Sequence, residues 1–327
     1  MGRRLRAFAT LIASAVRRIH DAMPISPDAA QPVTVFGGTG FLGRRIITKL
    51  RDAGFAVRIA SRHPDRSQLL FPDADPRIIS TRADANEDAS VAAAVTGCFA
   101  VVNAVSLYVE HGKDSFRSVH VEGAARVARL AAAAGVVRLV HVSGIGADPG
   151  SPSLYIRSRG EGEAAVTQAF PSAILIRPAV MFGPDDAFLA PLLSMLRRLP
   201  AFPLFGSGET KLQPACVEDV GEAVARILRL PATERIYELA GPRVYTYRSL
   251  LQELGRSRDK QPILVPVPLA LWKVIASLGE MLPRPPITIN QVELMERDNV
   301  ASPGMPGFAD LQIAARSLEE VLRPIGV

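Results

Sequence analysis

A glycine-rich turn places the tightest constraint on the fold of this chain. The sequence Gly37-Gly-Thr-Gly-Phe-Leu-Gly43 directly follows a β-branched run at 33–36, and a helical stretch at 44–53 directly follows the turn. In such a unit the first glycine permits a tight turn, Gly40 lets the backbone approach a pyrophosphate, and Gly43 lets the helix pack close to the sheet. The phosphates then lie at the positive N-terminus of the helix. The turn therefore predicts a dinucleotide site, and a glycine-rich turn without a ligand is the alternative.

Short β-branched runs alternate with Ala-, Arg- and Leu-rich helical stretches from Pro32 to about residue 240. This alternation is typical of a parallel sheet that helices cover on both faces. We therefore predict the α/β class, with a Rossmann-type, doubly wound parallel sheet of about seven strands. The expected strands are 33–36, 56–60, 77–81, 100–104, 138–143, 173–177 and 236–240.

The second half of the chain has a looser periodicity and more prolines, which indicates a smaller C-terminal lid or partner domain. We expect the dinucleotide-binding domain at 32–180, with 213–241 returning to it, and the lid at 181–212 and 242–327. The lid holds an apolar set that either contacts a lipid or a partner or packs in the core. Its members are Phe188, Leu189, Leu192, Leu193, Met195 and Leu196.

The formal charge of +6 is concentrated at the N-terminus, where five arginines and no acid occur in the first twenty residues. The remaining chain is nearly neutral, so the positive charge does not indicate a nucleic-acid partner. No run of 18 uncharged apolar residues occurs, so no span of a bilayer is expected. Cys98 and Cys216 lie far apart, and the five histidines are scattered. We therefore expect no metal site and two reduced, buried cysteines.

Residues 1–31 are interpreted as a basic amphipathic helix followed by a linker. On a helix, Leu5, Phe8, Ile12 and Val16 share one face, opposite the arginines. Such a helix binds an anionic membrane surface or a partner. A cleaved targeting peptide, a secretory signal, or a translation start at Met23 are the alternatives.

The choice of cofactor depends on the residues that end the second strand. Ser61, Arg62 and His63 stand there, with no acid before Asp65. An acid at this position binds the 2′-hydroxyl of NAD, whereas Arg62 can bind a 2′-phosphate through two charge-assisted hydrogen bonds. The sequence therefore favours NADP(H) over NAD(H), and a solvated arginine in an arginine-rich chain is the alternative.

A serine and a tyrosine motif follow the fifth strand. Ser143 ends that strand, and Tyr155-Ile-Arg-Ser-Arg159 comes soon after. The chain here resembles the extended short-chain dehydrogenases/reductases, in which the tyrosine is the general acid/base, the serine polarises the substrate oxygen, and a lysine lowers the tyrosine pKa. This chain has Arg159 in place of the lysine. Arginine keeps the positive charge but is bulkier and does not release a proton. The resemblance therefore implies a weak or vestigial catalytic set of Ser143, Tyr155 and Arg159.

Three further motifs narrow the resemblance. They are Arg177-Pro-Ala-Val-Met-Phe-Gly-Pro-Asp-Asp-Ala-Phe-Leu, Gln213-Pro-Ala-Cys-Val-Glu-Asp-Val and Gln291-Val-Glu-Leu-Met-Glu-Arg-Asp-Asn-Val. With Tyr-x-Arg-Ser at 155–158, they resemble the nucleotide-binding accessory subunit of respiratory complex I (NADH:ubiquinone oxidoreductase) and its bacterial relatives. The likeness covers residues 32–327. It implies a tightly held NADPH with a structural role and a place on the peripheral arm near the membrane, where quinone enters.

The motifs and the resemblance together give a set of expected cofactor contacts. Asp84 is expected at the adenine amino group, the stretch 103–105 at the ribose, and Pro178 near the nicotinamide. The full set is Gly37, Thr39, Gly40, Phe41, Leu42, Gly43, Ser61, Arg62, Asp84, Asn103, Ala104, Val105, Ser143, Tyr155, Arg159 and Pro178.

The leading hypothesis is an NADP(H)-binding, non-catalytic accessory subunit or assembly factor of complex I. It is expected peripherally on the cytoplasmic side of the inner membrane in a bacterium, or on the matrix side in a mitochondrion. The first alternative is an active NADP-dependent reductase or epimerase that acts on a quinone precursor, in ubiquinone biosynthesis, or on a nucleotide sugar. The second is a nucleotide-sensing regulator without chemistry.

Overall fold

The computed structural model describes residues 31–71, 75–186, 188–198, 201–230, 234–257, 261–282, 285 and 287–322. The basic N-terminal helix expected from the sequence lies outside the described residues. Within them, no helix is both long enough and apolar enough to cross a membrane.

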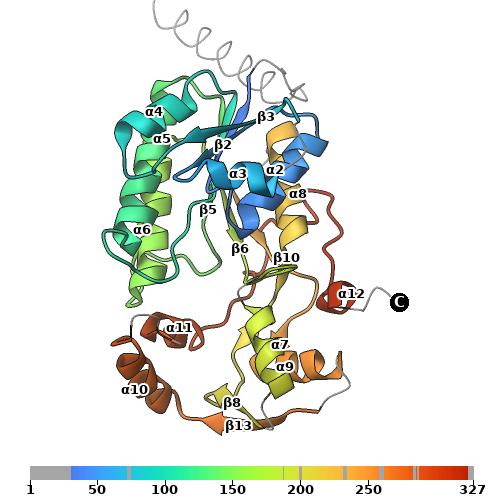
Figure 1. Cartoon of the computed structure of the whole chain (residues 1–327). Helices are drawn as coiled ribbons and strands as arrows, with labels where there is room; N and C mark the ends of the chain where they lie inside the picture. The colour runs from blue at the N-terminus through green and yellow to red at the C-terminus, as the bar shows by residue number, and fades with distance from the viewer. Residues whose placement is uncertain are drawn as a thin grey trace, which may run out of the picture.

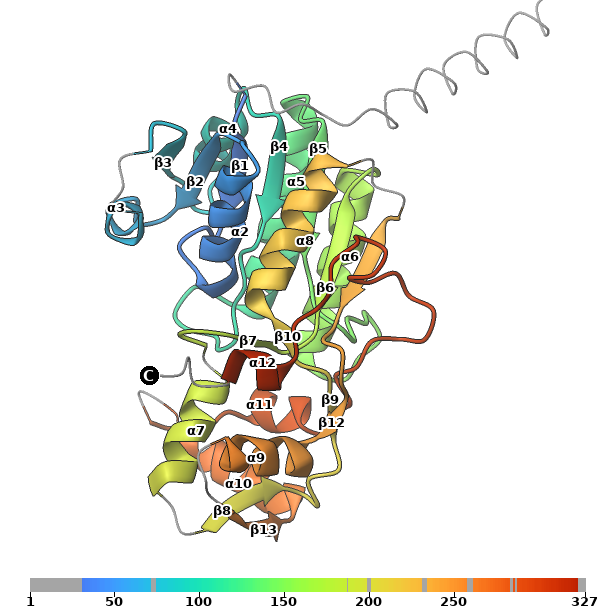
Figure 2. The same cartoon turned by 90° about the vertical axis from the view of Figure 1, so that its right-hand side faces the viewer.

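Seven parallel strands form the central sheet, in the spatial order 3-2-1-4-5-6-11 (Figures 1 and 2). Each strand lies within one residue of its predicted ends, so the predicted fold class is confirmed. The first strand, Val-Thr-Val-Phe, is buried at all four positions, as expected for a parallel strand that helices cover on both sides. The strands are β1 (Val33–Phe36), β2 (Val57–Ser61), β3 (Ile78–Arg82), β4 (Ala100–Asn103), β5 (Arg138–Val142), β6 (Ile174–Pro178) and β11 (Ile236–Leu239).

Helices cover both faces of this sheet (Figure 2). One face packs on α2 (Phe41–Asp52) and α8 (Val217–Arg229), whose buried residues join the apolar side chains of β1, β2 and β6. The other face packs on α4 (Asp88–Val95), α5 (Ala124–Ala133) and α6 (Leu154–Ala169). A short helix α3 (Asp65–Leu70) follows β2, and a π-helical segment, Arg117–Gly123, leads into α5.

A third buried cluster lies below the sheet and is built from residues between Phe182 and Leu318 (Figure 1). The division of the chain into a nucleotide-binding domain and a lid stays a prediction, although this separate cluster fits it. The elements here are β7 (Met181–Phe182), α7 (Leu189–Arg198), β8 (Ala201–Phe205), β9 (Lys211–Leu212), β10 (Ala215–Cys216), β12 (Tyr245–Thr246), α9 (Tyr247–Arg256), β13 (Ile263–Val267), α10 (Leu269–Gly279), α11 (Ile289–Leu294) and α12 (Leu318–Leu322).

The apolar set around α7 serves mainly as core. Leu189 and Leu196 are buried, and Phe188, Leu192 and Leu193 pack against the same cluster. Only Met195 of this set is exposed. Core packing is therefore the correct interpretation for most of these side chains.

Two of the sequence motifs form hydrogen bonds at the places where the chain passes between the sheet and the lower cluster. The side-chain oxygen of Asn299 accepts a hydrogen bond from Val180 N at 2.7 Å, and its backbone bonds Lys211 and Gln213. The amide of Gln213 donates to Gly241 O at 2.7 Å and accepts from Ala301 N at 3.0 Å. The motifs 213–220 and 291–300 thus have a structural role where the chain passes between the two parts.

A charged network ties the C-terminal segment to the sheet. Arg177 on β6 donates two hydrogen bonds to Glu163, at 2.9 and 2.6 Å, and one to Glu238 at 3.4 Å. Glu238 in turn accepts from Ser302 N at 2.7 Å. The pairing compensates two buried carboxylates that would otherwise be costly in the interior.

Candidate functional site

The glycine-rich turn lies against the end of β4, and its glycines are needed for that approach. Gly37 has a φ of +75°, and a Cβ placed on it would stand 2.7 Å from Ala104 O. A Cβ on Gly43 would overlap the carbonyl oxygen of Gly37. Gly38, which the sequence analysis did not single out, would meet Ile47 and Ile59. The turn therefore has the close-packed backbone that a bound pyrophosphate requires.

The N-terminus of α2 begins at this turn. Its N-cap is Gly40, with no side-chain cap and no acidic residue in the first turn. The first N–H groups of a helix have no partner inside the helix, so a helix start without a cap is suited to an anion. Phe41 and Leu42 belong to this first turn, and the guanidinium of Arg45 lies over the Phe41 ring at 5.1 Å.

The end of β2 places Arg62 beside a carboxylate that sequence reasoning missed. Arg62 Nη1 donates to Asp114 Oδ2 at 2.7 Å, and this hydrogen bond raises the pKa of Arg62. Ser61 is buried, and its hydroxyl lies 3.4 Å from that of Thr39. Ser61 thus lies against Thr39 of the turn, and Arg62 follows Ser61 in sequence.

Two other expected contacts stand at the ends of β3 and β4. Asp84 is buried and accepts a hydrogen bond from Asn86 N at 2.9 Å, while Lys113 Nζ lies 4.0 Å from its other oxygen. Asn103 is buried and its amide oxygen accepts from Val105 N at 3.3 Å. Both side chains therefore shape the local backbone at the carboxyl edge of the sheet, whether or not they also contact a cofactor.

Arg159 occupies the position of the family's lysine and is buried at 6% exposure. It lies one helical turn after Tyr155 on α6, so the two side chains share a face. Its Nη2 donates to Tyr155 Oη at 3.0 Å and to Ser106 Oγ at 2.5 Å, and its Nη1 donates to Val142 O at 3.2 Å. Burial lowers its pKa, but the nearby Tyr155 and Tyr108 hydroxyls outweigh that effect and raise the pKa. Arg159 is therefore a fixed positive charge in contact with the tyrosine.

Ser143 stands at the end of β5, next to β6. Its backbone N–H donates to Ile176 O at 2.8 Å, and Ile145 N donates to Pro178 O at 3.1 Å. The Ser143 hydroxyl is buried and has no hydrogen-bond partner among the described residues. A buried hydroxyl without a partner is costly, so this oxygen is available to a bound molecule.

A hydrogen-bond chain supports α6 behind Tyr155. The Leu107 N–H donates to His120 Nε2 at 3.0 Å, so Nδ1 carries the proton of the neutral ring. That Nδ1 lies 3.0 Å from Ser158 Oγ, which donates to Tyr155 O at 2.8 Å. This series of hydrogen bonds gives a role to Ser158 of the Tyr-x-Arg-Ser motif and to His120, which the sequence analysis left without a function.

Sequence reasoning also missed the aromatic contacts of Tyr155 and the exposed apolar side chains around α10. Tyr108 stacks on Tyr155 with ring centroids 5.8 Å apart, while Phe116 meets the Tyr155 ring edge-on at 5.5 Å.

In the part of the chain that lies below the sheet, helix α10 and the residues on either side of it carry large apolar side chains that are 40–82% exposed. This α10 face consists of Ile263, Val265, Leu271, Val274, Ile275, Leu278, Met281 and Leu282.

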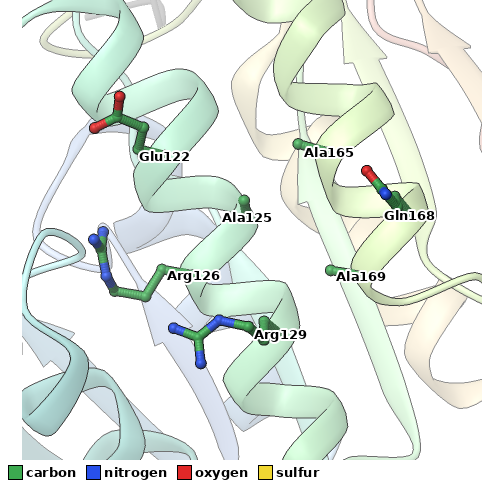
Figure 3. Close-up of a pocket in the computed structure, with 7 residues that line it drawn as sticks. All are labelled: Glu122, Ala125, Arg126, Arg129, Ala165, Gln168 and Ala169. Carbon is green, nitrogen blue, oxygen red and sulfur yellow. The ribbon is translucent and has the colours of Figure 1, made fainter.

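A shallow hollow of about 500 Å³ lies between α5 and α6 (Figure 3). Its lining residues are Glu122, Ala125, Arg126, Arg129, Ala165, Gln168 and Ala169, none of which belongs to the expected site. Among the described residues, no group of three or more histidine, cysteine, aspartate or glutamate side chains is placed to hold a metal ion.

Known proteins resemble this chain over most of its length. The family described as NAD(P)H-binding matches residues 37–169. The chain is 30% identical to subunit 9 of the mitochondrial NADH dehydrogenase [ubiquinone] 1 alpha subcomplex of Arabidopsis thaliana, over 88% of this chain and 75% of that protein. It is 32% identical to the mitochondrial NADH-ubiquinone oxidoreductase 40 kDa subunit of Neurospora crassa, over 86% of this chain and 74% of that protein. A ceramide reductase of Caulobacter vibrioides is 27% identical, over 75% and 76% of the two chains.

Solved structures support the fold. A nucleoside-diphosphate-sugar epimerase of Staphylococcus aureus superposes with a TM-score of 0.72 at 17% identity, covering 90% of this chain and all of that one (100%). A triphenylmethane reductase of Citrobacter sp. in complex with NADP(H) superposes with a TM-score of 0.69 at 17% identity, covering 89% of this chain and 99% of that one. The chain therefore has the Rossmann-like fold of nicotinamide-cofactor proteins.

The free energy of unfolding is expected to depend on pH, because two histidines are buried. Burial and the nearby Arg159 charge lower the pKa of His120 to about 2 and that of His141 to about 3, against 6.5 in the unfolded chain. Below pH 6.5 the unfolded state therefore binds more protons than the folded state, and the free energy of unfolding falls by up to about 1.4 kcal/mol per pH unit for each histidine.

Urea unfolding between pH 7 and pH 4.5 measures this slope. We expect His120→Gln and His141→Gln each to give a shallower slope than the unchanged chain. The exposed His63→Gln is the control and is expected to keep the full slope. An unchanged slope in both buried variants would contradict the assignment of neutral, buried rings.

Proposed function

The chain belongs to the protein family of subunit 9 of the NADH dehydrogenase [ubiquinone] alpha subcomplex and the 40 kDa subunit of NADH-ubiquinone oxidoreductase, and on this basis we propose that it is an NADP(H)-binding, non-catalytic accessory subunit or assembly factor of respiratory complex I. The proposed absence of turnover rests on the buried Arg159. This residue donates a hydrogen bond to Tyr155 at the position where active relatives of the fold have a lysine.

The site residues fit a dinucleotide. The Gly37–Gly43 turn and the uncapped start of α2 would hold the pyrophosphate, and the buried Ser143 hydroxyl has no other described partner at the nicotinamide end. The backbone of 104–105 lies against Gly37 of the turn, and Thr39 and Asn103 would contact the part of the dinucleotide between these points. When bound, a nicotinamide cofactor supplies a hydride acceptor or donor at this end of the site.

The described contacts of Arg159 favour binding over proton transfer. A lysine in this position can exchange a proton, whereas a guanidinium stays charged at all physiological pH values. Arg159 also divides its donors among Tyr155, Ser106 and the Val142 carbonyl, so its position is fixed by three partners. In this arrangement Tyr155 and Arg159 are cofactor ligands and structural residues, and Tyr155 lacks a proton relay through Arg159.

The preference for NADP(H) over NAD(H) rests on Arg62. Its side chain is 54% exposed at the end of β2, where a ribose 2′-phosphate would be bound, and no acid stands next to it in sequence. A guanidinium–phosphate pair is charge-assisted and can be bidentate.

We expect Arg62→Ala to weaken NADPH binding about tenfold or more, the loss typical of one charge-assisted hydrogen bond, while NADH binding changes little. Titration of cofactor fluorescence measures both dissociation constants. Arg77→Ala, which removes an exposed arginine just before β3, is the matched control and should change neither. Equal losses for NADPH and NADH would remove the assignment of Arg62 to the 2′-phosphate.

The partner proposal places a neighbouring complex I subunit on the α10 face. That face is exposed, apolar and close to neutral, because its one lysine, Lys273, pairs with Glu296 at 2.8 Å. Exposed apolar patches of this kind are typical of interfaces. Together with family membership, this favours a protein partner in the peripheral arm of the complex, near the membrane. The protein would then lie on the cytoplasmic side of the inner membrane in a bacterium, or on the matrix side in a mitochondrion.

Native electrophoresis of membranes from the protein's own host, solubilised in mild detergent, tests this partner. We expect the tagged chain to migrate with NADH-oxidising activity at high mass, and Leu278→Glu to release much of it. Val137→Glu, at a 55% exposed site just before β5 (against 63% for Leu278), is the control and should leave comigration intact. Migration of the unchanged chain at monomer or small-oligomer mass would refute the proposal, and vesicle binding lost in Leu278→Glu would assign the face to lipid instead.

The retained Ser143 and Tyr155 favour one alternative, an active NADP-dependent reductase or epimerase. Relatives with a reductase name support it, including the ceramide reductase of Caulobacter vibrioides. In this alternative, Arg159 weakens an active site that still works.

Arg159→Lys separates the two functions. We expect no gain in NADPH oxidation with quinones, aldehydes or nucleotide sugars, provided that the variant still binds NADPH. A gain of about a hundredfold, the scale of positioned acid–base catalysis, would instead support a weakened enzyme.

A further inference from the structure

Asp114 is the residue that the structure places against Arg62. Its Oδ2 accepts the 2.7 Å hydrogen bond from Arg62, while its Oδ1 is buried and has no hydrogen-bond partner among the described residues. The side chain of Asp114 is 17% exposed, against 54% for Arg62. The backbone of Asp114 is held by two hydrogen bonds with His111, each of 3.0 Å. A constrained, mostly buried carboxylate therefore faces a half-exposed guanidinium.

Nearby carboxylates balance the positive charge of Arg62. Asp114 and, at longer range, Asp84 both raise the pKa of Arg62. Lys113 Nζ lies 4.0 Å from Asp84 Oδ2. A 2′-phosphate, which carries a charge between about −1.5 and −2, would therefore meet Arg62 in competition with a carboxylate.

We propose that Asp114 is a specificity-determining residue that holds Arg62 when no 2′-phosphate is bound and so weakens the preference of the site for NADP(H) over NAD(H). NADP(H) must take Arg62 from Asp114, and the released carboxylate is then partly buried without a cation. NAD(H) has no 2′-phosphate and leaves the Arg62–Asp114 pair intact. The penalty therefore falls on one cofactor only. This inference rests on the proposed role of Arg62.

The test is the Asp114→Asn variant of the full chain, titrated with NADPH and with NADH. Asparagine keeps the size and the acceptor oxygen but removes the competing charge. We expect NADPH to bind about three- to tenfold more tightly, the effect of one partly exposed charge pair, and NADH to change less than about twofold. The fragments adenosine 2′,5′-bisphosphate and 5′-AMP should show the same contrast, because the effect lies at the adenine end.

Two variants serve as controls. Glu110→Gln removes a carboxylate from the same loop, where it accepts from Phe116 N at 2.7 Å and not from Arg62, and it should leave the NADPH-to-NADH ratio unchanged. Arg62→Ala combined with Asp114→Asn should abolish the gain, because no guanidinium remains to be freed. If Asp114→Asn does not fold, Asp114→Ser tests the same loss of charge.

The outcomes separate this inference from the proposed cofactor preference. An unchanged ratio in folded Asp114→Asn, or the same gain for both cofactors, overturns the role of Asp114 alone. If the unchanged chain binds both cofactors equally and Asp114→Asn creates a preference for NADPH, the inference holds and the proposed preference of the natural chain fails. If Arg62→Ala changes neither cofactor, both fail.

Discussion

The buried positive charge of Arg159 is the constraint on which the arrangement of the site depends. A guanidinium in the interior needs acceptors for its N–H groups and no second cation nearby. Val142 O at the end of β5, Ser106 in the loop after β4 and the Tyr155 hydroxyl accept from its two Nη groups, whereas its buried Nε has no partner among the described residues. Burial and, after it, the Arg159 charge disfavour protonation of His120 and His141, whose rings stay neutral. The positive charge of Arg159 thus acts on several neighbours at once.

The sheet could be predicted from sequence because its physical causes are local. The buried parallel strands are short runs rich in β-branched residues, and a Cβ on Gly40 or Gly43 would meet Gly37 O within the same turn. The lower part could not be predicted in the same detail. Its two-residue strands β7, β9, β10 and β12 are too short to give a periodic signal, and they are defined only by their partners.

In the candidate site, too, contacts between residues close in sequence could be predicted, and contacts between distant segments could not. Tyr155 and Arg159 stand four positions apart on α6, and their contact follows from helical spacing. Asp114, Tyr108 and Ser106 were missed, because the loop after β4 folds back over α6 and the end of β2 without any periodic pattern. His120 was missed for a related reason, since its partner Ser158 is 38 positions away. Such contacts exist only in the folded chain.

The hydrogen bonds that involve Val180, Gln213, Gly241 and Asn299 also bear on how long a cofactor stays bound. Each marks a passage of the chain between the sheet and the lower part, and hydrogen bonds join the passages to one another. A lid on a single linker can swing open on one hinge, whereas the predicted lid of this chain must bend several chain segments together. Opening should therefore be rare, and exchange of a bound dinucleotide slow. A long residence time suits a molecule retained as part of an assembly better than one consumed and replaced at every turnover.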